Sequence, residues 1–314
     1  MKFGILGDAK IAREKLIPAM RAGGHEIVCL GRRDPSQPTE YPIWQGVRQT
    51  SYEQMLADPQ VEAVYNPLPN HLHVPMSIKA LQAGKPVLCE KPMALTLAEL
   101  DQLEAAAQKS GCFVYEAFMV RHHPQWHWLR GLDIGARQLV MAQFSYPPPR
   151  SDNIRNYAGM GGGPIWDIGC YCVLSGMMLF GTKPTLLSIT KKPAAGLDVE
   201  EAASALLDFG DGRVLTMQVS AAASLSQSVY LLGSKGWAQL TVPFNPPPVT
   251  TARWAGAEDG RTGLLGAGES LQFEACDQYQ LMLDDFAAAC ADKRPADFTD
   301  SRALTGLLSQ MVAA

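Results

Sequence analysis

The residues best suited to chemistry begin with a charged pair at the end of an apolar run. The stretch "VLCEKPM", residues 87–93, places Glu90 and Lys91 directly before Pro92. If the apolar residues form a buried strand, both charges emerge at the edge of a sheet, where ligands bind in open α/β folds. An ammonium group at such an edge can stabilise a nearby anion or donate a hydrogen bond to a developing oxyanion. Lys91 is therefore a candidate catalytic residue.

A second candidate group follows three glycines in "GGGPIWDIGCY", residues 161–171. The glycines predict a pliant loop that can approach a ligand closely, because they carry no Cβ. Pro164 begins an expected helix, on which Asp167 and Tyr171, four residues apart, share one side. Trp166 is a further candidate for contact with a substrate. The alternative interpretation is a core tyrosine that is hydrogen-bonded to its neighbour.

Together these side chains favour the oxidation of an alcohol. When hydride leaves a secondary or hemiacetal alcohol, the hydroxyl proton must also be removed. A phenol has a pKa of about 10 and is a poor base near neutrality, but an adjacent ammonium lowers that pKa. We interpret Tyr171 as the acid/base, Lys91 as its electrostatic partner, and Asp167 as the group that orients a substrate hydroxyl or holds Lys91. Hydride would pass directly to a nicotinamide, so this chemistry needs no metal.

The start of the chain predicts a dinucleotide site. "GILGDAKIA" fits G-x-G-x-x-G/A, with alanine at the second glycine. Such a turn presents backbone N–H groups and the positive end of a helix to a pyrophosphate. The alternative is a plain strand–helix turn. The predicted cofactor contacts in this turn are Gly7, Asp8, Ala9, Lys10 and Ile11.

Two arginines in "CLGRRDP" suggest which dinucleotide is bound. Arg32 and Arg33 lie at the end of the second expected strand, where dinucleotide-binding folds contact the adenosine ribose. A carboxylate there favours the 2′-hydroxyl of NAD, whereas guanidinium groups favour a 2′-phosphate. We predict NADP, with NAD as the alternative, because Asp34 could bind the ribose itself or pair with an arginine. A solvated loop is the remaining interpretation.

The histidines do not form a recognisable metal site. In "NPLPNHLH", residues 66–73, two prolines stiffen a loop after the third strand of the expected α/β sheet, where a ligand lies in such folds. His71 and His73 have no third ligand within reach in the sequence, so we expect packing or hydrogen bonding from them. The "RHH" at residues 121–123 is no better as a metal site.

Short apolar runs alternate with helical patterns through the first third of the chain, which predicts βαβ units and a doubly wound parallel sheet. Thr96 and Glu99 form a capping box for one of these helices, and Gly111 ends it. From about residue 121 the runs become β-rich with turn signals between them, which predicts an α+β domain with a large, mostly antiparallel, open-faced sheet. We expect a Rossmann domain over 1–120 and a second domain over 121–299, with a final helix over 300–314 packed on the first domain.

Composition excludes several classes of protein. The chain of 314 residues is 47% apolar and 18% charged, with a formal net charge of -4, so nucleic acid is not an expected partner. The longest apolar run, around "YCVLSGMMLFG", is too short for a membrane span, and the start does not resemble a secretory signal. Seven cysteines without paired spacing favour a reducing cytoplasm over a disulfide scaffold.

The order "GILGDAKIA", "NPLPNHLH", "CEKPMALT", "EAFMVRHHPQ", "GGGPIWDIGCY" resembles the glucose–fructose oxidoreductase/inositol dehydrogenase/MocA (Gfo/Idh/MocA) superfamily over nearly the whole chain. The nearest group resembles NADP-dependent D-xylose 1-dehydrogenases and dimeric dihydrodiol dehydrogenases. The resemblance implies a catalytic Lys91 followed by a cis peptide bond, and an acid/base at Tyr171. It also implies cofactor contacts at Pro67, Leu68, Asn70, His73, Glu90, Lys91 and Arg121, with Lys91, Arg121, Trp166, Asp167 and Tyr171 near the substrate. Val120 and Asn66 depart from the usual pattern of the superfamily.

These observations predict an NADP-dependent oxidoreductase that acts on a small molecule, an aldose or related polyol, with C1 oxidation favoured. The alternatives are a trans-dihydrodiol dehydrogenase and a regulator that senses the dinucleotide without turnover. The resemblance further implies a homodimer or higher homo-oligomer through the open face of the second sheet, and we expect a cytoplasmic protein.

Overall fold

The computed structural model describes residues 1–37, 39, 41–181, 183–256 and 268–314. It divides into two compact units: Met1–Met119 with Asp277–Arg302, and Val120–Cys276 with Ala303–Ala314. The first unit has a six-stranded parallel sheet and the second an eight-stranded, mostly antiparallel sheet. The predicted fold class is therefore confirmed.

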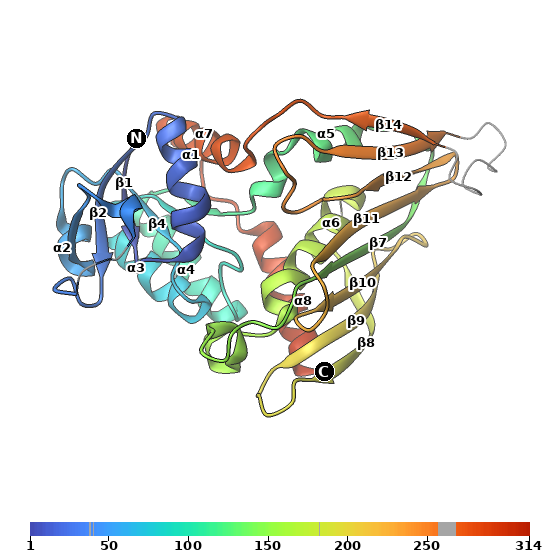
Figure 1. Cartoon of the computed structure of the whole chain (residues 1–314), viewed down its shortest axis with the longest axis horizontal. Coiled ribbons are helices and arrows are strands. Elements are labelled where there is room, and N and C mark those ends of the chain that lie inside the picture. The colour runs from blue at the N-terminus through green and yellow to red at the C-terminus, as the bar shows by residue number, and fades with distance from the viewer. Residues whose placement is uncertain (38, 40, 182, 257–267) are drawn as a thin grey trace. The chain divides into compact units, whose positions relative to one another are not determined.

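The sheet of the first unit has the strand order β3-β2-β1-β4-β5-β6, and all its neighbouring strands are parallel (Figure 1). This order reverses direction between β1 and β4, which is the position where dinucleotides bind in such folds. The strands are β1 (Lys2–Leu6), β2 (Glu26–Arg32), β3 (Arg48–Ser51), β4 (Ala63–Asn66), β5 (Val87–Cys89) and β6 (Val114–Glu116). β3 was not predicted, because "RQTS" is short and largely polar.

Helices cover both faces of this sheet. Residues of β1 alternate between the faces: Phe3 contacts Phe286 of α7 with 6.1 Å between ring centroids, whereas Gly4 faces Met55 of α2. The predicted capping box and glycine end of α4 are both present. The helical segments are η1 (Ala12–Leu16), α1 (Ile17–Ala22), η2 (Pro42–Trp44), α2 (Tyr52–Ala57), η3 (Asn70–Leu72), α3 (His73–Gln82), α4 (Leu97–Ser110) and α7 (Gln278–Ala291).

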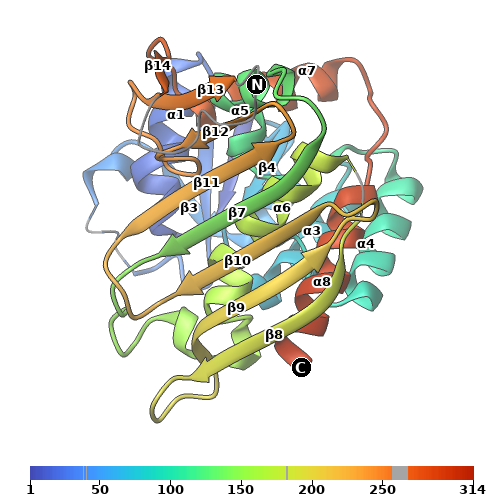
Figure 2. The same cartoon turned by 90° about the vertical axis from the view of Figure 1, so that its right-hand side faces the viewer.

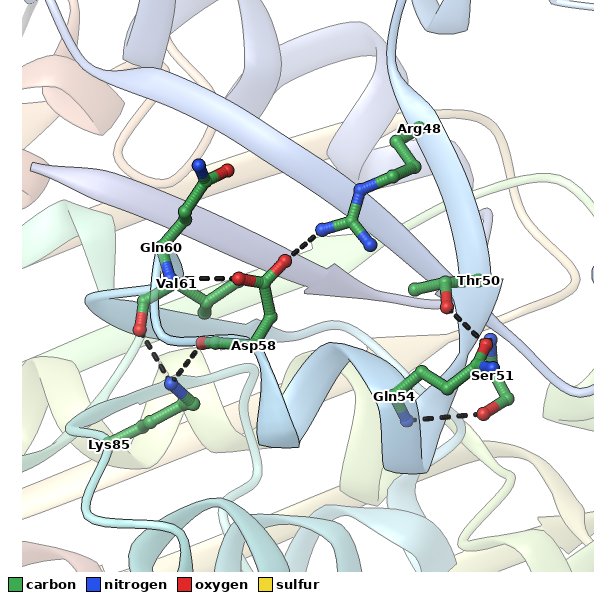
Figure 3. A network of polar contacts seen from close by, with 8 residues as sticks. All are labelled: Arg48, Thr50, Ser51, Gln54, Asp58, Gln60, Val61 and Lys85. Carbon is green, nitrogen blue, oxygen red and sulfur yellow. Dashed lines mark hydrogen bonds and ion pairs between the residues drawn. The ribbon is translucent and has the colours of Figure 1, made fainter.

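A polar network fixes the short helix α2 (Figure 3). Ser51 and Gln54 exchange side chain–backbone hydrogen bonds of 3.2 and 3.3 Å, which caps the N-terminus of the helix. Beyond its C-terminus, the buried Lys85 donates to the carbonyl oxygens of Asp58 and Val61, at 2.8 and 2.6 Å. The lysine therefore gives hydrogen bonds to two backbone oxygens of the turn that follows the helix.

The strand register brings polar residues together at the carboxyl edge of the sheet. Asn66, the last residue of β4, pairs with Cys89 of β5, which in turn pairs with Glu116 of β6. Glu90 and Lys91 follow β5 at the same edge. The prediction that this charged pair emerges at the end of a buried strand is borne out by these bounds.

The sheet of the second unit has the order β14-β13-β12-β11-β7-β10-β9-β8 (Figure 2). Its one parallel pair among the described residues is β7 with β10. The strands are β7 (Arg137–Ser145), β8 (Thr185–Pro193), β9 (Glu200–Asp208), β10 (Val214–Ser220), β11 (Ser226–Gly233), β12 (Gly236–Leu240), β13 (Thr251–Gly256) and β14 (Glu269–Gln272). Its helical segments are α5 (Pro124–Gly131), η5 (Ile154–Asn156), η6 (Ala158–Met160), η7 (Ile165–Gly169) and α6 (Cys170–Phe180), preceded by η4 (Met119–His122).

Only one face of this sheet is covered by α6. Leu215 and Met217 of β10 point toward glycines of the η7–α6 segment, so alternate residues point the other way. That second face includes the uncharged side chains of Met141 of β7, Thr216 of β10 and Ser204 of β9. The open-faced sheet predicted from the sequence is thus present.

The boundary near residue 120 agrees with the predicted one, but the end of the chain differs from the expectation. Residues 277–302 belong to the first unit, because Phe286 of α7 packs on Phe3 and Phe113 of the parallel sheet. The last helix, α8 (Thr299–Ala313), begins in the first unit, but residues 303–314 belong to the second. There the Lys191 side chain of β8 donates to the carbonyl oxygen of Val312. The expectation that the whole final helix packs on the first domain is corrected accordingly.

The helical run Ala158–Phe180 is longer than the sequence suggested. Its 23 residues meet the length and composition of a membrane span, which corrects the expectation that the apolar run is too short. However, 89% of its most apolar window is buried inside the protein, as in the core helix of a globular domain. By itself the run is weak evidence for a membrane span.

Candidate active site

The turn after β1 has the geometry that a dinucleotide fold requires. Gly7 has a φ of +79°, and a Cβ there would come within 2.8 Å of Leu68 Cδ2. Its N–H donates to the Gly31 carbonyl oxygen at 2.8 Å, which holds the turn against the end of β2. Only glycine fits this position without strain. Ala9 and the exposed Lys10 follow, at the start of the first helix.

Asp8 lies in the same turn and has its own partners. Its Oδ1 accepts hydrogen bonds from Arg13 Nη1 at 2.6 Å and from Trp44 Nε1 at 2.7 Å. A carboxylate would repel a pyrophosphate, and Arg13 offsets that charge. The turn therefore fits a dinucleotide, with Asp8 fixing the turn through its side chain.

The residues after β2 fit a phosphate better than a bare ribose. Asp34 Oδ1 accepts from the N–H and the hydroxyl of Ser36 at 3.0 and 2.6 Å, and these bonds lower the pKa of Asp34. Arg32 donates to Gln49 Oε1 at 2.9 Å. The exposed Arg33 makes no hydrogen bond or ion pair with other described residues. Of the two arginines, Arg33 is the one whose guanidinium is available to a ligand.

His73 links the loop after β4 to the segment after β5. Its ring is 1% exposed, with Nδ1 2.8 Å from the Pro92 carbonyl oxygen and Nε2 2.7 Å from the Leu68 carbonyl oxygen. Burial lowers the pKa of His73 to about 4, so the ring is neutral near pH 7. The structure therefore places His73 behind Pro67, Leu68 and Asn70, as a support for the loop. Its burial does not suit the direct cofactor contact that we expected.

Asn66 is a buried polar residue whose structural role the sequence did not reveal. Its Nδ2 donates to the His73 carbonyl oxygen at 2.9 Å and to Ser77 Oγ at 3.0 Å. Its Oδ1 accepts from Leu68 N at 3.4 Å. The buried amide thus stabilises the same loop. In the sequence, this role was indicated only by a polar residue at the end of an apolar strand.

The segment that carries Lys91 is anchored on both sides. Glu90 Oε1 accepts from the Tyr65 hydroxyl at 2.7 Å. Glu116 Oε1 accepts from Met93 N at 2.7 Å, and its other oxygen accepts from Ser301 Oγ at 2.5 Å. Lys91 lies between these two anchors, and the Lys91–Pro92 bond is cis, as the resemblance implied. We interpret Glu90 as an anchor for the lysine segment.

In the second unit, Asp167 and Tyr171 lie where a π-helical turn, η7, runs into α6. Such turns are rare and occur often at functional sites. The Tyr171 ring is 6% exposed and packs against Phe144 and Phe244, with centroid distances of 6.0 and 5.4 Å, while these two rings stack on each other at 5.2 Å. Arg155 Nε donates to Asp167 Oδ2 at 2.5 Å. The structure thus brings the acid and the phenol of the predicted group together in one unit.

The three glycines before this helix do not form a pliant ligand-binding loop. A Cβ on Gly162 would come within 2.6 Å of the Arg155 carbonyl oxygen, and a Cβ on Gly163 within 2.6 Å of Glu200 Oε1. Glu200 also accepts from Ile165 N at 2.9 Å, at the start of η7. The glycines therefore allow close packing within the unit, which corrects our interpretation of this stretch.

The remaining candidates lie in less informative positions. Trp166 is 6% exposed, and Arg121 lies half-buried in η4. Among the residues that the structure describes, no group of three or more His, Cys, Asp or Glu side chains could hold a metal ion.

Comparison with known proteins identifies the family. Residues 1–118 match the model of the oxidoreductase family with an NAD-binding Rossmann fold, Gfo/Idh/MocA, and residues 127–239 match the Gfo/Idh/MocA C-terminal domain. The chain belongs to this family. It is therefore an NAD(P)-dependent oxidoreductase, and the sensing regulator is not supported.

Similar proteins from several organisms support this assignment. The chain is 35% identical to an uncharacterized oxidoreductase of Rhizobium meliloti over 94% of this chain and 90% of that protein. It is 31% identical to an NADP-dependent D-xylose 1-dehydrogenase of Haloferax volcanii, over 92% and 89% of the two chains. A trans-1,2-dihydrobenzene-1,2-diol dehydrogenase of Xenopus tropicalis is 30% identical over 76% and 74%.

A solved structure shows the same fold. A 3-ketoreductase from Actinomadura kijaniata, in complex with NADP and TDP-benzene, superposes with a TM-score of 0.89. It is 26% identical and covers 100% of this chain and 97% of that one. This similarity extends the family assignment over both units.

Proposed function

We propose that this protein is an NADP-dependent dehydrogenase that oxidises C1 of an aldose or related polyol. The observation that carries the proposal is the Tyr171 phenol, packed against two aromatic rings and four residues after the paired Asp167 carboxylate. A base and a hydrogen-bond acceptor on one buried helix suit a substrate with several hydroxyl groups. The similarity to a D-xylose 1-dehydrogenase supports the same substrate class.

Each group has a separate role in this proposal. Tyr171 removes the hydroxyl proton, Lys91 favours the phenolate, and Asp167 accepts a hydrogen bond from the substrate. Arg121 and Trp166 contribute to substrate binding. The nicotinamide, when bound, accepts the hydride. The available guanidinium of Arg33 and the local pairing of Asp34 support NADP over NAD.

A trans-dihydrodiol is the second candidate substrate. The phenyl rings of Phe144 and Phe244 beside Tyr171 would suit a partly apolar ring. The similarity to a dihydrodiol dehydrogenase points the same way. Both substrates undergo the same chemistry.

We further propose that the protein is cytoplasmic and forms a homodimer through the open face of the second sheet. None of the seven cysteines is in a disulfide bond, which suits a reducing compartment. The uncharged Met141, Thr216 and Ser204 on that face suit the core of an interface, where charged residues are depleted.

The function is tested by following NADPH absorbance with pentoses, hexoses and dihydrodiols, each offered with NADP and with NAD. We expect turnover of an aldose with NADP. Turnover of dihydrodiols alone would favour the second candidate. Tight NADP binding without turnover of any of these compounds would refute the proposal.

A further inference from the structure

An ion pair inside the second unit holds the Asp167 carboxylate. Arg155 Nε lies 2.5 Å from Asp167 Oδ2, and the Asp167 side chain is only 14% exposed. Attraction to Asp167 raises the pKa of Arg155, so the guanidinium stays charged throughout the working pH range. A charge-assisted bond between two such groups is short and directional.

The backbone of Arg155 is fixed by the loop that leads into the Asp167 helix. Gly163 N donates to the Arg155 carbonyl oxygen at 2.9 Å, and Gly162 packs against that same oxygen. Asn153 caps the short helical turn η5 by accepting from Arg155 N at 3.0 Å. Arg155 is therefore held in place through both its backbone and its side chain. A residue that orients Asp167 needs such a fixed position.

The charged and titratable groups around this pair come from several elements. Tyr146 follows β7, and burial and then the Asp167 carboxylate raise its pKa. Glu200, at the start of β9, has a pKa raised by burial and binds the backbone of η7. Tyr171 of α6 lies within electrostatic range of the Arg155 guanidinium. The Arg155 guanidinium thus interacts electrostatically with the Asp167 carboxylate and with the phenols of Tyr146 and Tyr171.

We propose that Arg155 is a positioning residue that holds Asp167 ionised and oriented to accept the hydroxyl next to the one that is oxidised, so that the substrate class is a vicinal diol. This inference rests on the proposed function, because Asp167 and Tyr171 act there on one substrate. Asp167 precedes Tyr171 by four residues, and side chains at this spacing are neighbours on one side of a helix. Two such groups can each form a hydrogen bond with one of two neighbouring hydroxyls of the same substrate. Aldoses and dihydrodiols both belong to this class.

The test compares substrates that differ by one hydroxyl, in enzymes that differ at Arg155. The substrate pairs are D-xylose with its 2-deoxy analogue, and trans-cyclohexane-1,2-diol with cyclohexanol. The variants are Arg155→Met, Arg155→Lys and the matched control Arg150→Met, whose arginine forms an exposed pair with Asp152. NADPH binding is measured by fluorescence, and folding by thermal denaturation.

Arg155→Met should lower kcat/KM for D-xylose and trans-cyclohexane-1,2-diol by about 10- to 100-fold, the scale of a misplaced binding group. It should have little effect on the two analogues that lack the neighbouring hydroxyl. The acidic limb of its pH profile should move to higher pH, because loss of a cation raises the pKa of the acids that it faced. Arg155→Lys should retain the pH profile and lose part of the diol preference, because lysine keeps the charge without the planar fork. Arg150→Met should match the wild type.

An Arg155→Met enzyme with unchanged diol preference and pH profile would overturn the inference. If that variant does not fold, Arg155→Lys decides alone, and a wild-type diol preference in it overturns the inference equally. Absence of wild-type turnover on every substrate would instead refute the proposed function, so the two failures are distinguishable.

Discussion

At the scale of single residues, the chemistry depends on side chains whose surroundings the fold has already fixed. Tyr171 packs against two stacked phenyl rings, and Asp167 is bound by an arginine twelve positions earlier in the chain. Neither partner of Tyr171 is adjacent to it in sequence. The types and spacing of Asp167 and Tyr171 were readable, but Arg155, Phe144 and Phe244 were not, because loops and strands bring them into place.

Replacement of Tyr171 by phenylalanine isolates its hydroxyl. The ring would keep its packing against Phe144 and Phe244, so thermal stability and NADPH binding should stay near wild type. Loss of the general base should lower kcat by roughly two to four orders of magnitude. Steady-state kinetics with the best substrate of the screen measures this effect. A kcat within a few-fold of wild type would exclude Tyr171 as the base.

Replacement of Arg33 by alanine tests the choice of cofactor. Because its guanidinium is available to a 2′-phosphate, the KM for NADP should rise by about 10- to 100-fold, the range of a charge-assisted hydrogen bond. The KM for NAD should stay unchanged, since NAD has no such phosphate. Arg21→Ala, at another exposed arginine of the same unit, is the control. An equal effect of Arg33→Ala on both cofactors would contradict the assignment.

At the scale of elements, the sequence predicted long periodic segments well and short polar ones poorly. The capping box of α4 and the first strand–turn–helix could be read because each has a local physical signature. The strand β3 and the helix α5 were missed, since "RQTS" has no apolar alternation and "PQWHWLRG" is short and mixed in character. The glycines at 161–163 were recognised, but their packing partners are distant in sequence.

The helix α5 makes stability depend on pH through its N-cap. His123 Nδ1 accepts from Gln125 N at 3.1 Å, and burial lowers the pKa of His123 to about 4. The unfolded chain, with a histidine pKa of about 6.5, binds the extra proton first as the pH falls. The stability contributed by this neutral histidine is therefore present above pH 6.5 and is lost as the pH falls from there toward 4.

The variant His123→Asn would keep a capping side chain without a titrating group in this range. Urea unfolding at pH 7.5 and pH 5 measures the difference. We expect the wild type to lose about 2 kcal/mol more than the variant between these two pH values. Equal losses would show that His123 does not titrate in this way.

At the scale of the whole molecule, the open face of the second sheet should determine the oligomeric state. Met141 on that face is 40% exposed, and a lysine there would place a charge in the proposed interface. Met141→Lys should therefore shift a dimer toward monomer in light scattering coupled to gel filtration. Leu281→Lys, on α7 and 37% exposed, is a control of similar exposure. A monomeric wild type would contradict the dimer.

Fold class and a late return of the chain to the first domain could be predicted at this scale, but the segment that returns could not. The boundary at about residue 120 was predicted because the sequence changes there from alternating strand and helix patterns to β-rich runs. The membership of residues 277–302 in the first unit follows from the packing of Phe286 on Phe3 and Phe113, which no local pattern reveals.

That late return has a consequence for biosynthesis. A ribosome releases the chain from its N-terminus, and domains ordinarily fold as they emerge. Here the parallel sheet lacks α7, Gln278–Ala291, until all the strands of the second sheet have been made. The nascent nucleotide-binding half must therefore wait, with the surface around Phe3 uncovered, until the strands of the other sheet have left the ribosome.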